Sequence, residues 1–246
     1  MTNRTILLQV VMMLSMTAFA QNQTTDLSSQ TEPNDKTRQA MFNLQDPSAA
    51  LTAGGAFYVS NPTFAYEIDP KKAYLNPTFQ PLSIVLLNGQ EYELPGRIRL
   101  IDQKVEVQMD DKVYDLDNQK VQAIIDAQGR VFVSGFDPTG RIKGTHLYEV
   151  AFAGADRRLL VNHSTVWEDP PQQNMFDTSE QRKTLKSVTR TYLVVGSNGL
   201  EINRLSDLAD VLGLSKRSEG MQFAKRNRLR NETADYVDLL QFIEAR

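Results

Sequence analysis

The chain has 246 residues, carries 27 basic and 30 acidic side chains for a formal net charge of −3, and contains no cysteine. A charge so close to balance gives no overall electrostatic case for nucleic-acid binding, which is typical of strongly basic domains. The absence of cysteine excludes disulfides, a thiol nucleophile and thiolate ligands for zinc. The length is sufficient for a domain with a hydrophobic core of ordinary size.

The N-terminus predicts an export signal. Arg4 supplies a basic start to the apolar run of residues 6–16. A small-x-small pattern follows, made by Ala18 and Ala20, of the kind that a signal peptidase cuts, here before Gln21. The apolar run is shorter than the ~20 residues of a membrane-spanning helix. We therefore expect an exported protein, periplasmic or secreted, that has no transmembrane span in the mature chain and, lacking a cysteine after the cleavage site, is not a lipoprotein.

Composition divides the rest of the chain into three parts. The segment after the signal is rich in Gln, Asn, Thr, Ser and Asp, and it has few large apolar residues with which to offset the entropy of ordering. Beyond it come strand-like and then helix-like patterns. The predicted organisation is a signal peptide at 1–20, a disordered leader at 21–55, a β-rich domain at 56–202 and a helical segment at 203–246 that packs on it.

The tetrapeptide Asn-Pro-Thr-Phe occurs twice, at residues 61–64 and 76–79. Asn-Pro favours a turn, and a phenylalanine two places after the proline can dock a loop into a groove. We interpret the two copies as loop anchors. The alternative is a pair of aromatic ligand clamps, which would need polar groups at a fixed spacing beside the aromatic rings.

The β-rich domain predicts a mainly antiparallel β-meander, folded as a sandwich or a partly closed barrel. Asn88-Gly89 is a strong signal for a two-residue hairpin. Val105, Val107 and Met109 alternate with polar residues, as expected of a strand with one buried face. The predicted strands are 84–87, 91–94, 97–101, 104–109, 112–116, 121–125, 131–134, 147–152, 159–167 and 191–195.

Two or three helices are predicted at the C-terminus. Ser206 is the expected N-cap of the first, and residues 214–226 form the second. Residues 232–245 form the third, with one apolar stripe of Tyr236, Val237, Leu240 and Ile243. Strands followed by helices indicate the α+β class.

Several motifs follow one another in a distinctive order: the segment 74–80, the Asn88-Gly89 hairpin, the pair 97–100 and 105–107, the segment 147–150, and a basic helix before an Asp-rich helix. In this order they resemble an uncharacterised family of exported proteins from Gram-negative bacteria of the Bacteroidetes group. The resemblance covers about residues 72–246. It implies export and an α+β organisation, and it supplies no catalytic residues.

Two motifs that suggest ligand binding lack the required chemistry. Residues 135–142 have the glycine spacing of a phosphate-binding loop, but Arg141 and Ile142 replace its lysine and its hydroxyl residue. Four acids, Asp110, Asp111, Asp115 and Asp117, crowd one hairpin without the central glycine of a calcium loop. We interpret the first as a turn and the second as a solvated strand face, with weak calcium binding as the alternative.

The two histidines, His146 and His163, are candidates for a metal site together with Glu149 or Glu168. No close histidine pair or HExxH motif supports this, so we interpret both as structural. We therefore predict no catalytic residue, no cofactor and no metal ligand from the sequence.

A basic cluster precedes the last predicted helix, and an exposed patch of this kind is suited to an anionic surface such as lipid head groups or a charged glycan. The alternative is an ordinary soluble helix face, since the segment has few apolar residues. The candidate residues are Lys216, Arg217, Lys225, Arg226, Arg228 and Arg230.

The sequence favours an exported, non-catalytic binding protein of the periplasm or cell envelope. Its partner would be an envelope protein or an anionic glycan or lipid surface. The competing hypothesis is a periplasmic hydrolase built on carboxylates, with Glu106, Asp110 and Glu149 as the candidates.

Overall fold

The computed structural model describes residues 55–60, 62, 64, 68–109, 111–138, 144–170, 183–196 and 198–245. These residues all belong to Gln45–Arg246, the second of two units into which the chain divides. The predicted signal peptide, its cleavage site at Ala18, Ala20 and Gln21, and nearly all of the predicted leader lie outside the described residues. In the described part of the chain, no helix has both the length and the apolar character needed to cross a membrane.

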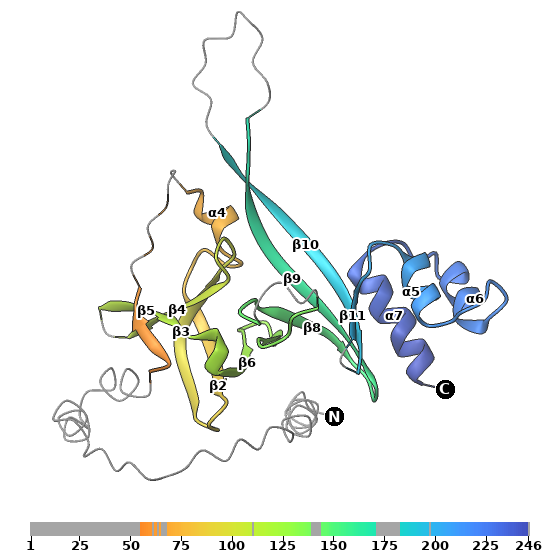
Figure 1. The fold of residues 1–246 in the computed structure, drawn as a ribbon, viewed down its shortest axis with the longest axis horizontal. Coiled ribbons are helices and arrows are strands. Elements are labelled where there is room, and N and C mark those ends of the chain that lie inside the picture. Colours follow the sequence, from red (N-terminus) through yellow and green to blue (C-terminus); the bar gives the residue numbers. More distant parts are fainter. Residues whose placement is uncertain are drawn as a thin grey trace, which may run out of the picture. The chain divides into compact units, whose positions relative to one another are not determined.

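Eleven strands form one open sheet in these described ranges, and helices follow it, which confirms the predicted α+β class (Figure 1). The order across the sheet is β1-β5-β4-β3-β2-β6-β7-β8-β9-β10-β11, with every neighbouring pair antiparallel. The meander is broken at two places: β1 pairs with β5 and not with β2, and β6 pairs with β2 and not with β5. The strands are β1 (Phe57–Val59), β2 (Gln80–Leu86), β3 (Glu91–Arg99), β4 (Lys104–Met109), β5 (Lys112–Leu116), β6 (Val121–Ile125), β7 (Val131–Val133), β8 (Tyr148–Ala153), β9 (Arg157–Glu168), β10 (Thr184–Val195) and β11 (Asn198–Glu201).

Strands β4, β5 and β6 begin and end at the predicted residues. The two strands predicted on either side of Pro95 are one strand, β3, because β4 pairs with β3 only from Gly96 onward and needs no amide hydrogen from the proline. A Cβ at Gly96 would lie 2.9 Å from the Glu106 carbonyl oxygen, so the close approach of β4 requires glycine here. The prediction missed the edge strands β1 and β11 and the polar first half of β10.

The helices after the sheet are α5 (Leu205–Val211), α6 (Glu219–Arg226) and α7 (Thr233–Glu244); α4 (Pro70–Ala73) and the 3-10 turn η1 (Asn118–Lys120) come earlier. The prediction that Ser206 caps the first helix is wrong. Arg204 is the cap residue, and its amide donates to Asp207 Oδ2 at 2.9 Å, so a carboxylate three residues later fixes the start. Helix α6 begins later than predicted, directly after Ser218, whose hydroxyl caps its first turn.

The buried apolar residues form two clusters. One joins the first strands and includes Ile84, Ile98, Val105, Val107 and Leu116. The other packs Leu159 of β9 and Leu193 of β10 against the C-terminal helices, where its buried members are Leu208, Tyr236, Leu239 and Leu240. The ring of Phe223 in α6 also stacks on that of Phe242 in α7, with centroids 4.2 Å apart. The helical segment is therefore held on the sheet by core contacts.

A row of polar and charged side chains crosses the first four strands of the sheet order. Tyr58 of β1 lies opposite Asp115 of β5, which lies opposite Glu106 of β4. Glu106 in turn lies opposite Arg97 of β3, and Arg97 Nε is 2.6 Å from Glu106 Oε2. Cross-strand register alone therefore brings two carboxylates and a guanidinium together.

Arg99, two residues further along β3, is only 1% exposed, as is Glu106. A buried charge is tolerated only where it is paired and hydrogen-bonded. Arg99 meets Asp102 through both carboxylate oxygens, at 2.8 and 2.9 Å, and Asp115 at 3.2 Å. Its remaining Nη1 donates to Glu106. Acids from one turn and two strands therefore converge on a single guanidinium.

The Asn-Pro-Thr-Phe copies each place a phenylalanine against an arginine of β3. The ring centroid of Phe79 lies 4.4 Å from the guanidinium carbon of Arg97, and that of Phe64 lies 5.8 Å from the guanidinium carbon of Arg99. Tyr74 adds a third ring, 3.9 Å from the same carbon of Arg97. Cations stack favourably on aromatic faces, so the structure gives both phenylalanines an anchoring role on the sheet.

Gln103 fastens the β3–β4 turn to β9. Its backbone is in the left-handed region, with φ of 58°, and its side chain is buried. The amide nitrogen donates to the carbonyls of Leu100 (3.0 Å) and His163 (2.8 Å). The amide oxygen accepts from the Leu147 amide (3.3 Å) and from Asn162 (2.9 Å). One side chain thus satisfies four groups from three segments.

We predict that Gln103→Leu lowers the free energy of unfolding by about 3 kcal/mol or more, because each buried polar group left without a partner costs roughly 1–3 kcal/mol. Gln90→Leu is the matched control, since Gln90 also bonds two side chains but is exposed. The free energy of unfolding of this control should fall by no more than about 0.5 kcal/mol. Urea unfolding followed by circular dichroism measures both values. Equal losses of unfolding free energy in the two variants would show that the buried hydrogen bonds of Gln103 do not stabilise the fold.

Candidate functional site

Glu106, one of the carboxylates expected for hydrolysis, is fully engaged within the sheet. Both arginines of β3 bond its oxygens, and the Tyr74 hydroxyl donates to Oε1 at 3.3 Å. Burial lowers the pKa of Arg99, but its hydrogen bonds and the surrounding acids outweigh burial and raise it. The guanidinium therefore stays charged, and Glu106 serves to compensate it. A general acid or base needs a carboxyl group within reach of the proton that it transfers, whereas the oxygens of Glu106 are occupied by these partners.

Glu149 pairs with His163 across β8 and β9, with Oε2 and Nε2 2.8 Å apart, and both side chains are partly exposed. The contact gives His163 a carboxylate partner on the neighbouring strand. The third candidate acid, Asp110, lies outside the described residues. Within the described ranges, no group of three or more His, Asp or Glu side chains is arranged to hold a metal ion.

Two further acids of the β4–β5 region, Asp115 and Asp117, also have separate partners. Asp115 bonds Arg99 and accepts from the Ser60 hydroxyl at 2.7 Å. Asp117 accepts from the Gln119 amide at 3.1 Å and so caps η1. Burial, together with the hydrogen bond to Asp117, raises the pKa of Tyr58 to about 12. These two acids hold the fold, and they do not converge on a shared calcium position.

A polar cleft lies between the β3–β4 turn and the β9–β10 hairpin, with a volume of about 230 Å³. His146 lines it, whereas His163, the other histidine of the candidate metal site, is not part of the lining. Strand β9 contributes Asn162 and Ser164, which alternate with His163 along the strand. Strand β10 contributes Arg190 and Tyr192. The full lining is Leu100, Ile101, Asp102, Gln103, His146, Asn162, Ser164, Thr165, Val166, Arg190 and Tyr192.

The cleft has a defined electrostatic character. Burial lowers the pKa of His146; Asp137 opposes that shift and Arg190 adds to it. Burial also raises the pKa of Tyr148, whose ring packs edge-on against Tyr192 with centroids 5.9 Å apart. At neutral pH the imidazole and both phenols are therefore uncharged. Arg190 is exposed, and none of the described carboxylates forms an ion pair with it.

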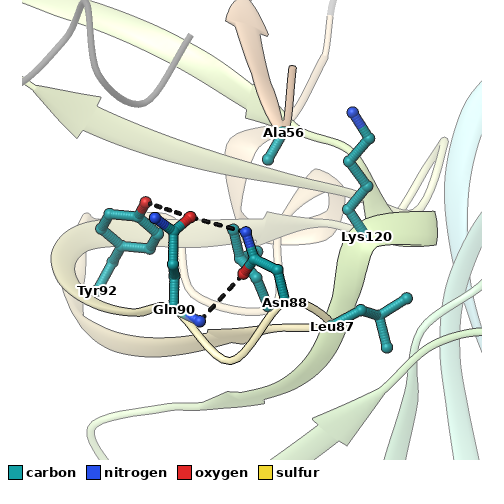
Figure 2. A pocket seen from close by; sticks show the side chains of 7 residues that line it. Ala56, Leu87, Asn88, Gln90, Tyr92 and Lys120 are labelled. Carbon is teal, nitrogen blue, oxygen red and sulfur yellow. Dashed lines mark hydrogen bonds between the residues drawn. The ribbon is translucent and has the colours of Figure 1, made fainter. Parts of the chain in front are cut away.

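A smaller cavity of about 140 Å³ lies at the β2–β3 hairpin (Figure 2). Its polar groups bond one another. The side-chain oxygen of Gln90 accepts from Asn88 Nδ2 at 2.8 Å and from the Tyr92 hydroxyl at 3.1 Å, as Figure 2 shows. Lys120 Nζ donates to the Gly55 carbonyl at 2.5 Å. We assign these groups to the hairpin turn and not to ligand binding.

The six basic residues at the C-terminus are all exposed, and none forms an ion pair within the described part of the chain. Lys216 and Arg217 precede the first residue of α6, whereas Lys225 and Arg226 end it. Of the eight residues of α6, the six at 219–224, about 9 Å of helix axis, lie between the two pairs. Arg228 and Arg230 follow the helix. The predicted cluster is thus a pair and a group of four at opposite ends of α6.

Comparisons of the chain with protein-family models, curated proteins and solved structures return no match. Function is therefore argued from the geometry of the chain's own residues.

The sequence missed the cleft, because the turn at 100–103 lies about 60 residues from its β9 wall and about 90 from its β10 wall, and none of these residues belongs to a motif. The one available signal was strand alternation. It placed Asn162 and Ser164 together on one face of β9, and both line the cleft. Nothing local indicated that the turn after Arg99 would lie opposite them.

We predict that two substitutions move the pKa of His146 in opposite directions. Arg190→Gln removes a cation that lowers this pKa, so the pKa should rise toward 6.5. Asp137→Asn removes an anion that raises it, so the pKa should fall further. A proton NMR titration can follow both imidazoles, with His163 as the internal reference. Shifts of the same sign would contradict this placement of the charges.

Proposed function

We propose that this chain is an exported, non-catalytic binding protein of the periplasm or cell envelope. In this proposal, the basic residues that flank α6 contact an anionic glycan or lipid surface. One observation carries the proposal: the six cationic side chains are exposed and have no carboxylate partner among the described residues. Export rests on the signal pattern at the N-terminus, and membership of the exported family stays a prediction from the resemblance.

The geometry of α6 supports a contact through charge and not through insertion. Ala224 of α6 is buried, and Phe223 stacks on Phe242, so the apolar side of the helix packs against the protein. What remains outward is polar and basic. A polybasic segment gains about 1 kcal/mol per Lys or Arg near an anionic membrane surface. Four adjacent cations therefore suffice for reversible attachment.

The competing hydrolase hypothesis has less support. Of its candidate acids, Glu106 is buried in ion pairs and Glu149 is paired with His163. A carboxylate hydrolase places two acids on either side of the scissile bond, one to donate a proton and one to attack or to activate water. Neither described candidate has a second free acid beside it.

We expect that neutralising Lys225, Arg226, Arg228 and Arg230 together to Gln abolishes cosedimentation of the chain with vesicles that contain phosphatidylglycerol. Losing about 4 kcal/mol corresponds to roughly a thousandfold weaker binding. Added salt should release the unaltered protein, because exposed charges are screened.

The matched control replaces four exposed lysines elsewhere with Gln: Lys71, Lys72, Lys112 and Lys186. It changes the net charge by the same amount and should bind nearly as the unaltered chain does. Unchanged binding of the first variant, or an equal loss in the control, would exclude the residues after α6 as the contact. Capture of an envelope protein that survives neutralisation would point to a different surface.

A further inference from the structure

The cleft between the β3–β4 turn and the β9–β10 hairpin has walls that are held in place without a ligand. Gln103 uses all its hydrogen-bonding groups to fasten the turn, and the Thr165 amide donates to the Leu100 carbonyl at 3.3 Å. At about 230 Å³, the cleft is smaller than the 300–1,000 Å³ typical of pockets for drug-sized molecules. It is suited to one small polar ring.

Asn162 offers the cleft a hydrogen-bond acceptor. It is buried, and both hydrogens of its amide nitrogen are used, one by Gln103 Oε1 at 2.9 Å and one by the Leu147 carbonyl at 2.9 Å. Because both partners are acceptors, the nitrogen must be the atom that faces them. The amide oxygen is the group left over. It is suited to accepting from a ligand hydroxyl.

Arg190 offers the cleft an uncompensated cation. The nearest acid on the lining, Asp102, is already bound by Arg99 through both carboxylate oxygens, so it does not neutralise Arg190. Burial raises the pKa of Tyr192 and the neighbouring Arg190 lowers it, and no carboxylate of the described residues pairs with the guanidinium. A planar fork of N–H groups matches a carboxylate in a bidentate geometry.

Ser164 and neutral His146 provide further hydrogen-bonding groups on the lining. The lining has no free acid for an ammonium group, because Asp102 is paired, and this disfavours amino acids.

We propose that this cleft binds a sugar acid, a single pyranose ring that carries a carboxylate, either free or at the end of an anionic glycan. Arg190 pairs with the carboxylate. Asn162, Ser164 and His146 bond the ring hydroxyls. The site is separate from the basic residues around α6, and it does not depend on the function proposed for them.

Isothermal titration of the full chain with glucuronate, glucose and acetate tests the proposal. Glucuronate should bind at least about tenfold more tightly than either of the others, because only it engages both Arg190 and the hydroxyl-binding groups. Tighter or equal binding of acetate would indicate a general anion site and overturn the proposal. So would the absence of any heat change with glucuronate at millimolar concentration.

Arg190→Gln should weaken glucuronate binding by about tenfold or more and leave glucose binding unchanged. Lys186→Gln is the matched control: it removes an exposed cation from the same strand, outside the cleft, and should change nothing. Equal losses of glucuronate affinity in the two variants would show that surface charge, and not a contact in the cleft, causes the effect. Arg190→Lys keeps the charge but lacks the planar guanidinium, so it should still bind glucuronate less tightly than the unaltered chain. Unfolding midpoints check that all three variants fold.

Discussion

Arg99 is buried together with its charge, and the first half of the sheet is arranged around it. Its guanidinium draws Asp102 from a turn, Glu106 from β4 and Asp115 from β5 onto one point. A buried cation without such partners would cost several kcal/mol, so each contributing segment is fixed by the same requirement. The rings of Phe64 and Phe79 stack on Arg99 and Arg97, respectively, and these contacts attach the segment before β2 to the same network.

The same network shapes the cleft. The double contact between Arg99 and Asp102 spans three residues and closes the turn after β3. Gln103 comes next, in a left-handed conformation, and reaches β9 and the segment before β8. The buried ion pairs thus position a wall that faces Asn162 and Arg190 across the cleft. Charge inside the sheet is structural, whereas charge that stays exposed, on β10 and around α6, is available for ligands.

The sequence predicted what depends on local pattern. The alternation in β4 and β5 and the apolar stripe of α7 were sufficient, because each of these elements buries its apolar face. It did not predict β1, whose three residues form a strand only by pairing with the distant β5. Nor did it show that Glu106 is paired, since its partners come from cross-strand register. Ser206 failed as a cap because the helix begins before it, where the Asp207 carboxylate accepts from the amides of Asn203 and Arg204.

A double-mutant cycle between Arg99 and Glu106 tests most directly whether buried charge pairing organises this fold. The unfolding free energies of Arg99→Met, Glu106→Leu and the double variant would be measured by urea denaturation. Each single change takes one partner from a buried charge that keeps its other partners, whereas the double change removes both members of the pair together. We therefore predict that the double variant is less destabilised than the sum of the two single losses, by about 2 kcal/mol or more. Strictly additive losses would show that the two residues act independently and would contradict this account.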